Sequence, residues 1–379
     1  MKKTMFAINF ILLATFLTSC GNYAGVHSLN SESVQKVSEK DDINLLDMKS
    51  YTSYGDQLKE ILFKEDDIII FSPESFKIAM DFYSNILTEE DRNSLKKALG
   101  NIDYLSYEDN DTFQIVNRLW VNDTKDFYVE NISNERVKDA IYLIDMSDSK
   151  TATYEKNEFV NDATHGLISS TPSVFDDTVN VDAMNILYFK DTWQRGEKIV
   201  DEEKSVFHNL DGSEGSALMF HDYGNTFFYD KTAHMCEMTY NDGFSFMVIL
   251  PDEGYSVKDI DIDSFIYKKV EYSNDGWTIS IPEFEAESVF DLGNVKGEID
   301  PFIMPLNNGI TNVSQVAKLT FDHTGTEAGA VTEAIVVTSS LVIPKNEPYE
   351  FVCDRPFIFC VIDTLNEDVA FMGIVKAFH

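Results

Sequence analysis

The residue types that most often carry enzymatic chemistry are present in this chain, but not at catalytic spacing. His234 and Cys236 stand two residues apart and could share a metal ion. A metal site needs at least one further ligand, which the surrounding sequence does not offer, so a structural histidine is the better interpretation. The stretch DGSEG at 211–215 lacks the first glycine of a G-x-S-x-G nucleophile elbow. Phosphate-binding loops, H-E-x-x-H and C-x-x-C are absent from the sequence. We therefore expect no enzyme, no cofactor and no metal site.

The segment GTEAGAVTEAIVVTSS at 325–340 has the strongest pattern in the chain. Side chains alternate between two faces along a strand. One face would carry only small or uncharged residues, namely Thr326, Ala328, Ala330, Thr332, Ala334, Val336 and Thr338. The other face would carry both charges, Glu327 and Glu333. A slip of one residue would bury these glutamates, so the pattern specifies the register. Taken alone, it also fits an ordinary half-buried strand.

The composition indicates a globular protein that carries a large excess of negative charge. The chain has 379 residues, of which 44% are hydrophobic, and 28 phenylalanines supply material for a large core. With 65 acidic and 30 basic residues, the formal net charge is −35. A field of this sign repels phosphate backbones, so we expect no nucleic-acid partner. Basic or neutral partners are favoured instead.

The N-terminal residues have the features of an export signal. Lys2 and Lys3 precede an apolar run that is too short to span a bilayer permanently. The stretch LTSCG at 17–21 resembles a bacterial lipobox, in which Cys20 would be acylated. We expect a signal peptide over 1–19, then the acylated cysteine and a polar tether over 20–45. This places the protein at the cell envelope, the outer membrane or the cell surface, held by lipid. The alternative is a plain secretory signal with an incidental cysteine.

Three cysteines remain beyond Cys20, namely Cys236, Cys353 and Cys360. All three stand in apolar, strand-like runs. Their odd number means that at least one thiol is free or pairs with another chain. We expect buried free cysteines, and no disulfide can be inferred.

The remaining chain predicts helices mostly first and strands mostly later. Two helices are expected within 71–100, and a third over 157–168 that is stopped by Gly166. Strand-like runs bounded by Asp, Asn, Gly or Pro occupy 177–193, 244–251, 277–284, 317–322 and 356–363. This order favours an α+β fold with large sheets over a wound parallel sheet. No composition shift divides 46–379, so we expect one domain there.

Several sequence motifs, in the right order, resemble those of the serpin family. The C-terminal stretch 349–378 contains D-R-P-F, a long apolar run and F-M-G, as the carboxyl end of a serpin does. Further resemblances are FSPESF (71–76), NEFVNDATHGLI (157–168), NILYFKDTW (185–193), FMVILP (246–251) and GTEAGAVT (325–332). Together they cover essentially all of 46–379.

The resemblance implies a serpin-like α+β fold with a large central mixed sheet, additional sheets, a helical N-terminal half and an exposed reactive loop over 325–348. Such a protein is a suicide inhibitor of serine proteases, and cysteine proteases are a further possibility. The cleaved loop inserts into the central sheet and traps the acyl-enzyme. The hinge that starts insertion would be Gly325, Thr326, Glu327, Ala328, Gly329, Ala330, Val331 and Thr332. The cluster that gates sheet opening would be Ser72, Ser75, Asn185, Gln315 and Trp193.

The reactive bond has two candidate positions. Counting from the hinge, whose distance to the cleavage site is nearly constant in inhibitory serpins, gives Ser339–Ser340, with Val337 and Thr338 as neighbouring candidates. Counting back from D-R-P-F gives Lys345. The first count predicts an elastase-like or subtilisin-like serine protease as the target, or a papain-like cysteine protease. The second would suit a trypsin-like enzyme.

The sequence departs from the family at three places. His323 stands where serpins usually have an acidic residue, which would weaken a salt link at the hinge. Gln315 stands where many have a histidine, so any pH dependence from that histidine would be lost. The stretch 290–309 is shorter than usual and lacks a predicted helix.

Two other classes remain open besides a monomeric, lipid-anchored inhibitor. The first is a non-inhibitory, serpin-like binding lipoprotein, whose loop is cleaved without forming an adduct. The second is an ordinary hydrolase, for which the sequence offers no nucleophile.

Overall fold

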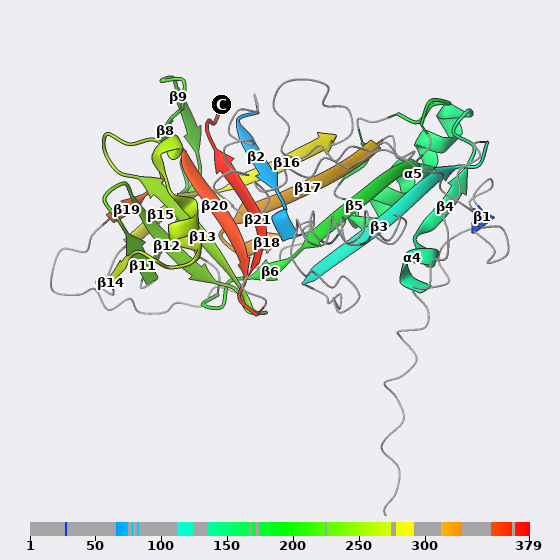
Figure 1. Cartoon of the computed structure of the whole chain (residues 1–379). Helices are drawn as coiled ribbons and strands as arrows, with labels where there is room; N and C mark the ends of the chain where they lie inside the picture. Colours follow the sequence, from blue (N-terminus) through cyan, green and yellow to red (C-terminus); the bar gives the residue numbers. More distant parts are fainter. Residues whose placement is uncertain are drawn as a thin grey trace, which may run out of the picture.

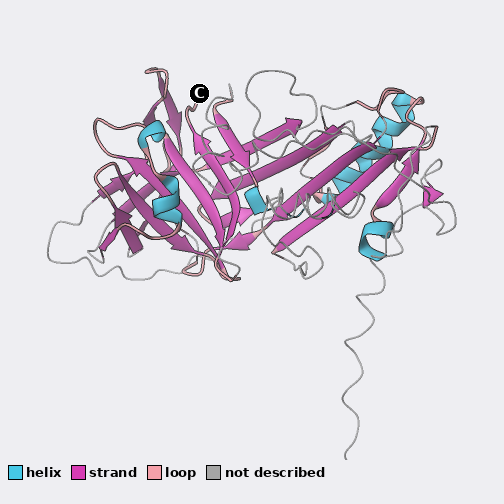
Figure 2. Cartoon of the chain, in the orientation of Figure 1, coloured by secondary structure: helices cyan, strands magenta, loops and turns pink. Residues whose placement is uncertain are grey.

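In the residues that it describes, the computed structural model of the chain is rich in strands and has one long helix (Figure 2). It describes residues 27–28, 66–74, 78, 82, 112–124, 135–166, 168–171, 174–179, 181–196, 198–223, 226–273, 278–291, 312–327, 350–365 and 368–379. Several expectations from the sequence lie outside these residues, namely the signal peptide, Cys20, the tether, Ser75, most of 75–111, the stretch 292–311 and the loop from Ala328 to Tyr349.

An eight-stranded mixed sheet forms one half of the structure (Figure 1). In spatial order it contains β1 (His27–Ser28), β4 (Ile141–Ile144), β3 (Phe113–Asn122), β5 (Val181–Phe189), β17 (Asn312–Asp322), β18 (Gly325–Glu327) and β6 (Asp191–Thr192), with β16 (Phe284–Asp291) on the other side of β17. The pairs β3–β4 and β5–β17 are parallel, and the β3–β5 and β16–β17 pairs are antiparallel. The strands expected over 177–193 and 317–322 are therefore confirmed.

Strands β5 and β17 are paired over only part of their length. Asn312–Val316 of β17 pair with Asp182–Ile186 of β5. Beyond Val316 the next neighbour on this side of β17 is β18, which pairs from Thr320 onward. We call the boundary between β5 and β17 the seam.

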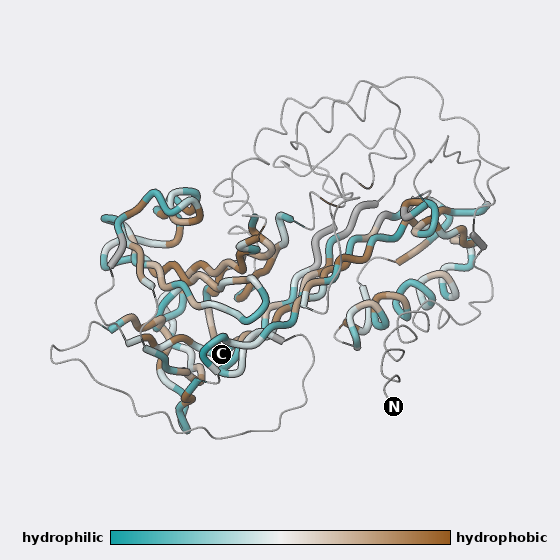
Figure 3. Tube along the Cα trace, turned by 90° about the horizontal axis from the view of Figure 1, so that it is seen from below, coloured by the Kyte–Doolittle hydropathy of each residue, from teal (hydrophilic) through white to brown (hydrophobic). Residues whose placement is uncertain are grey.

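Helix α5 (Ser149–Ala163) covers one face of this sheet, as the view from below shows on the right (Figure 3). Its apolar residues share a cluster with residues of four strands, namely Trp120 of β3, Ile144 of β4, Met184 and Ile186 of β5, and Val316 of β17. The helix therefore packs on β5, in the same apolar cluster as Val316 on the other side of the seam. It begins earlier than the 157–168 prediction because the Asp148 side chain caps the Thr151 N–H at 3.3 Å. It ends before Gly166, which has a φ of +88°.

A seven-stranded sheet forms the other half and contributes more residues than any other sheet to the larger apolar core (Figure 1). Its strands are β14 (Glu271–Ser273), β11 (Thr226–Tyr229), β12 (Ala233–Thr239), β13 (Phe244–Pro251), β20 (Phe357–Asp363), β21 (Asp368–Val375) and β2 (Ile68–Phe71). Every residue of β13 is buried. The expected strand over 244–251 and the C-terminal strand pair, β20 and β21, are confirmed.

Smaller elements complete the described structure. A four-stranded sheet contains β19 (Glu350–Val352), β15 (Thr278–Pro282), β10 (Met219–Tyr223) and β7 (Ile199–Val200), and β8 (Ser205–His208) pairs with β9 (Glu214–Ala217). The other helical segments are α4 (Glu135–Asp139), α6 (Ile262–Ile266) and the single turn η3 (Val257–Asp259). Among the described residues we find no helix that is both long and apolar enough for a membrane span.

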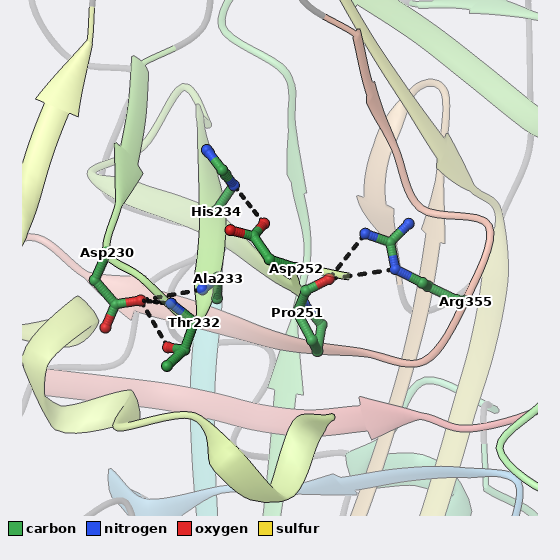
Figure 4. Close-up of polar contacts among 7 residues, drawn as sticks. All are labelled: Asp230, Thr232, Ala233, His234, Pro251, Asp252 and Arg355. Carbon is green, nitrogen blue, oxygen red and sulfur yellow. Dashed lines mark hydrogen bonds and ion pairs between the residues drawn. The ribbon is translucent and has the colours of Figure 1, made fainter. Parts of the chain in front are cut away.

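Two of the sequence motifs meet in space. Arg355 of D-R-P-F donates two hydrogen bonds, of 3.2 and 2.8 Å, to the carbonyl oxygen of Pro251 at the end of FMVILP (Figure 4). Beside them the His234 ring contacts Asp252 at 2.6 Å. The guanidinium fork thus fixes the end of β13 to the segment between β19 and β20.

Candidate functional site

The first residues of the predicted hinge already lie in the eight-stranded sheet. On one side Thr326 and Glu327 of β18 pair with Phe321 and Thr320 of β17. On the other side Gly325 and Thr326 pair with β6. The start of the hinge therefore forms a short strand between β17 and β6, at the end of the seam where β5 and β17 are not paired with each other.

Gly325 fits this position because it has no side chain. Its φ is +153°, and a Cβ atom there would lie 2.3 Å from the carbonyl oxygen of Asp191 and 2.7 Å from the Cα of Thr192. Both the backbone conformation and the close approach to β6 require glycine. The sequence predicted this residue as the start of the hinge.

A buried aromatic pair supports the next hinge residue from below. The hydroxyl groups of Thr326 and Tyr240 share a hydrogen bond, and both residues are buried. The Tyr240 ring stacks on Trp193, with ring centroids 4.4 Å apart. Trp193 in turn donates from Nε1 to the carbonyl oxygen of Asp322 at 3.0 Å. Burial raises the pKa of Tyr240 well above its ordinary value, so its hydroxyl stays protonated.

The buried carboxylate of Asp191 lies on the β6 side of Thr326. Asp191 is 5% exposed and accepts hydrogen bonds from the N–H groups of Thr192 at 2.7 Å and Asp242 at 3.0 Å. Burial raises the pKa of Asp191 above its ordinary value, although these hydrogen bonds oppose the shift. The hinge thus lies against a carboxylate that is costly to keep charged.

The expectation of a weakened salt link at His323 needs correction. The His323 ring contacts Glu283 at 2.6 Å through Nδ1, and the His323 N–H donates to the same oxygen at 3.1 Å. A histidine–carboxylate pair is therefore present just before the hinge. Sequence reasoning missed it because the acidic partner, Glu283, lies 40 residues upstream on the turn between β15 and β16.

Ser72 and Gln315 meet under the centre of the sheet, as predicted. The Ser72 N–H donates to Gln315 Oε1 at 3.0 Å, and Gln315 Nε2 donates to the Ser72 carbonyl oxygen at 3.0 Å. The Ser72 hydroxyl donates to the carbonyl oxygen of Ala370 at 2.6 Å. Gln315 thus satisfies both main-chain groups of a buried residue.

Asn185 stands directly across the seam from Gln315, because the two are register partners of β5 and β17. Its Nδ2 donates to Asn117 Oδ1 at 3.0 Å. The Nδ2 donor of Asn117 itself is buried without an acceptor in the part of the chain that is described. This polar group, which we call the seam cluster, consists of Ser72, Asn117, Asn185 and Gln315.

Three placements differ from the sequence prediction of the cluster. Trp193 lies at the hinge with Tyr240, not with Ser72, because β6 follows the end of β5. Two residues of the same region were not predicted, Asn117 and Ser288. The Ser288 hydroxyl accepts a hydrogen bond from the Ile70 N–H at 3.1 Å. Both lie in strands whose alternating pattern predicts faces but gives no sign of which strands become neighbours.

The residues considered for enzymatic chemistry have structural environments. His234 is engaged by Asp252, whereas Cys236 is buried in the core, where burial raises the pKa of its thiol. Cys353 and Cys360 are likewise buried and free. Within the described ranges no group of three metal-ligating side chains occurs.

One serine, histidine and aspartate do come together on the four-stranded sheet. His221 contacts Ser280 Oγ through Nδ1 and Asp201 through Nε2, both at 2.8 Å. An acyl-transfer site also needs donors aimed at a developing oxyanion. Strand β15 is paired with β10 and β19 around Ser280, so its main-chain groups belong to sheet ladders. This triad gives the hydrolase alternative a nucleophile, but among the described residues we find no oxyanion hole beside it.

Comparison with known proteins agrees with the fold. The profile of one family, described as serpin (serine protease inhibitor), matches residues 56–377. A serpin-like protein of Thermococcus kodakarensis is 25% identical over 276 residues, which are 68% of this chain and 65% of that protein. Leukocyte elastase inhibitor A of Rattus norvegicus is 24% identical over 306 residues, covering 70% of this chain and 77% of the relative.

Solved structures of the same fold superpose on almost the whole chain. The thermophilic serpin tengpin in its native state has a TM-score of 0.70 at 20% identity, covering 93% of this chain and all of tengpin (100%). Thyroxine-binding globulin in complex with thyroxine has a TM-score of 0.68 at 17% identity, covering 88% and 99% of the two chains. Because the family profile spans most of the sequence and the described sheets have the same architecture, this chain belongs to the serpin family.

Proposed function

We propose that this protein is a suicide inhibitor of serine proteases, with cysteine proteases as a further target class. The observation that carries the proposal is the hinge. Gly325–Glu327 already form a strand between β17 and β6 at one end of the seam, and β5 and β17 pair with each other only at the other end. A protease would cleave the loop over 325–348, and the loop would then continue down the seam. The covalently held protease would be carried along and deformed.

The register of β18 defines how far the loop can insert. If the antiparallel pairing continues, each further residue of the loop pairs with the preceding residue of β17 on one side. On the other side it pairs with the preceding residue of β6 and then of β5. Ile335 would then reach the positions of Asn312 and Asp182, which are already partners of each other. The two ladders thus agree on a single path. Since β17 has 11 residues, the inserted strand would run from Gly325 to Ile335.

The small face of the loop fits this path. Thr326 faces the core, so every second residue after it would also face the core. Ala328 would lie between Leu319 and Phe189, and Ala330 between Ala317 and Leu187, all of which are buried. The absence of charge and bulk on this face therefore matches a closely packed interior.

A hydroxyl would arrive at the polar part of the seam. The same register brings Thr332 between Gln315 and Asn185. There a threonine hydroxyl can donate to and accept from side-chain amides. The polar residue on the inner face of the loop thus coincides with the seam cluster.

The energy of insertion is sufficient to deform a bound enzyme. Roughly a dozen new ladder hydrogen bonds at about 0.5–1.5 kcal/mol each, with apolar burial added, reach on the order of 10 kcal/mol. A typical domain has a total stability of about 5–15 kcal/mol. The uncleaved chain would hold this energy as a metastable state.

The path also favours a reactive bond that closely follows Ile335. Cleavage must follow Ile335 closely if the whole seam is to be filled while the protease is drawn to its far end. Ser339–Ser340 meets this condition, and so do cleavages at Val337 or Thr338, whereas Lys345 would leave a long uninserted tail. Small and β-branched residues around this bond suit an elastase-like or subtilisin-like serine protease, or a papain-like cysteine protease. We propose a monomeric inhibitor, anchored at the cell envelope through Cys20.

A second candidate function is a non-inhibitory binding protein. The similarity to thyroxine-binding globulin supports it, since serpin folds also hold small ligands. The small, uncharged hinge face favours inhibition, because a chain that never inserts needs no such face.

The test is incubation of residues 21–379 with elastase, subtilisin, trypsin and papain. A boiling-stable adduct on an SDS gel, with a released peptide that begins at Ser340, is expected for at least one of the first two proteases or for papain. Cleavage by all four without any adduct would contradict the inhibitory function for these enzymes. Hydrolysis of a p-nitrophenyl ester that is lost in Ser280→Ala would favour the hydrolase instead.

A further inference from the structure

The serine, histidine and aspartate of the four-stranded sheet lie on its outer face, away from the apolar core. On β15, Ile279 and Ile281 are buried in the larger core cluster, so Ser280 between them points to the other face. His221 of β10 is the register partner of Ser280 and therefore shares its face. Asp201 directly follows β7, the strand on the other side of β10. Three neighbouring strands thus bring these side chains together on one surface.

The hydrogen bonds of His221 assign a role to each member of this group. His221 Nε2 lies 2.8 Å from Asp201 Oδ1, and a carboxylate can only accept, so the ring hydrogen is on Nε2. Nδ1 of the neutral ring is then an acceptor, and it lies 2.8 Å from Ser280 Oγ. The Ser280 hydroxyl therefore donates to a ring nitrogen whose tautomer Asp201 fixes. In this arrangement a histidine can act as the general base of a serine nucleophile.

Reagents can reach this group from the solvent. The side chains of His221 and Asp201 are each 39% exposed, and Ser280 is half-buried beside them. The cysteines of the described chain are intrinsically stronger nucleophiles, but all of them are 0% exposed. Ser280 is therefore the accessible nucleophile with a base in place.

The same sheet limits the chemistry of this serine. The Ser280 carbonyl oxygen accepts from the Cys353 N–H at 2.9 Å, and β15 is paired on both sides. Loss of a single oxyanion donor slows acyl transfer about 10²–10³-fold. Amides and ordinary esters are therefore poor acyl donors at this site, whereas a donor with a good leaving group needs less stabilisation. An acyl group held on Ser280 is itself an ordinary ester, so it would leave slowly.

We propose that Ser280 is an acylation site, which takes one acyl group from an activated donor such as a thioester or an aryl ester. Ser280 Oγ attacks the acyl carbon while its proton moves to His221 Nδ1. The bond between the acyl carbon and the leaving group breaks, and the imidazolium passes the proton to the departing thiolate or phenolate. The products are acyl-Ser280 and a free thiol or phenol. Asp201 is a positioning residue, because it acts through the His221 ring.

The first test treats residues 21–379 with p-nitrophenyl acetate and locates the acetyl groups by peptide mass spectrometry. Ser264 is the matched internal control, because it is also half-buried but its hydroxyl donates to the Asp261 carboxylate at 2.8 Å instead of to a histidine. Ser280 should be acetylated about 100-fold faster than Ser264 or more, since general base catalysis contributes about 10²–10⁴-fold. Equal rates at the two serines of the unaltered chain would overturn the proposal.

Substitutions of the two partners test the assigned roles. His221→Gln should lower the acetylation rate of Ser280 to that of Ser264. Asp201→Asn should lower it toward the same value, and Asp201→Glu should restore part of it. Because the control serine is in the same molecule, a general loss of stability cannot produce these changes in the ratio. A ratio that stays unchanged in His221→Gln would contradict the role of the base.

The amount of p-nitrophenolate separates a modification site from an enzyme. We expect a burst of about one equivalent per chain that is absent in Ser280→Ala. Continued release that Ser280→Ala removes would mean that the acyl group is hydrolysed, and the hydrolase alternative would then replace this proposal. Ser280→Ala should form the protease adduct in the same yield as the parent, so the inhibitory function is tested separately.

Discussion

The seven-stranded and eight-stranded sheets of this protein have similar sizes but opposite degrees of completion. In the seven-stranded sheet, β13 pairs with β12 and β20 along its length, and every one of its residues is buried. In the eight-stranded sheet, β5 and β17 pair over Asp182–Ile186 and then separate around the hinge. One sheet is fully paired, and the other is the one into which the proposed function inserts a strand of the same chain.

The chemistry of the two interiors explains this difference. The centre of the seven-stranded sheet is apolar, and its strands can only gain by remaining paired. The seam instead contains amides and a serine, whose hydrogen bonds can be made with one set of neighbours or with another. The polar seam thus suits the opening that the proposed function requires, whereas the apolar interior of the seven-stranded sheet favours strands that stay paired.

The largest effect is expected from a charge on the inner face of the loop. Ala330→Arg would bring a guanidinium between Ala317 and Leu187, where an unpaired charge costs several kcal/mol. We expect the free energy of unfolding of the uncleaved protein to change by less than about 0.5 kcal/mol. The yield of protease adduct should fall about tenfold or more. Gel titration measures the yield. Val331→Arg, on the opposite face, is the control, and an equal loss there would show that the faces are assigned wrongly.

A methyl group added to the finished sheet should destabilise the whole protein. A Cβ on Gly373 would lie 2.2 Å from the Ile69 carbonyl oxygen and 2.3 Å from Phe359 Cζ. Gly373→Ala should therefore cost about 3–5 kcal/mol in urea unfolding.

Gly325→Ala makes an equally close contact at the seam, 2.3 Å from the Asp191 carbonyl oxygen. There we expect the hinge to leave the sheet, at a cost of only about 1 kcal/mol. Equal losses in the two variants would contradict the contrast between a closed and an open sheet.

The seam cluster should show an intermediate effect. Gln315→Leu leaves the buried N–H and carbonyl groups of Ser72 unpaired, so unfolding should become easier by about 2–4 kcal/mol. Gln315→His keeps a hydrogen-bonding side chain and should cost less. Denaturant unfolding measures both variants. A leucine variant as stable as the parent would mean that this polar contact does not hold the seam closed.

The smallest expected effect is a pH dependence of stability that arises from Asp191, beside the hinge. Because the pKa of Asp191 is raised by burial, its contribution to stability is fully present below its unfolded pKa and is lost as pH rises through its folded pKa. Asp191→Asn should remove this loss and gain stability relative to the parent as pH rises over that window.

Asp176→Asn is the matched control for that pH dependence. Hydrogen bonds from Thr178 lower the pKa of Asp176, so the parent gains stability from it as pH rises. Melting curves from pH 3 to 7 separate the two. Parallel slopes for both variants would contradict the assignment.

The sequence predicted the finished sheet better than the open one. The strands β13, β20 and β21 are uninterrupted apolar runs bounded by turn residues, and such runs identify a buried strand locally. The seam depends on which strands become neighbours, which periodicity does not encode. Gln315 and Asn185 were predicted through the family resemblance, but Asn117 and Glu283 were missed.

The hinge shows where local pattern and tertiary structure meet. Alternation over 325–340 predicted a strand with one small face, and the start of that strand, β18, lies in the sheet. The β17 and β6 neighbours fix the register of β18, and with it the position that Thr332 would reach in the proposed insertion. Trp193 was predicted as part of the sheet-opening cluster, but its stacking partner Tyr240, 47 residues away in the sequence, was not predicted.

The most direct test of the account is a crystal structure of the chain cleaved after Ser339. The account predicts a new central strand between β5 and β17, with Thr332 level with Gln315 and Asn185 and with Ile335 level with Asp182 and Asn312. A cleaved loop that stays outside the sheet, or that enters it in a register in which Thr332 misses the seam cluster, would contradict the account.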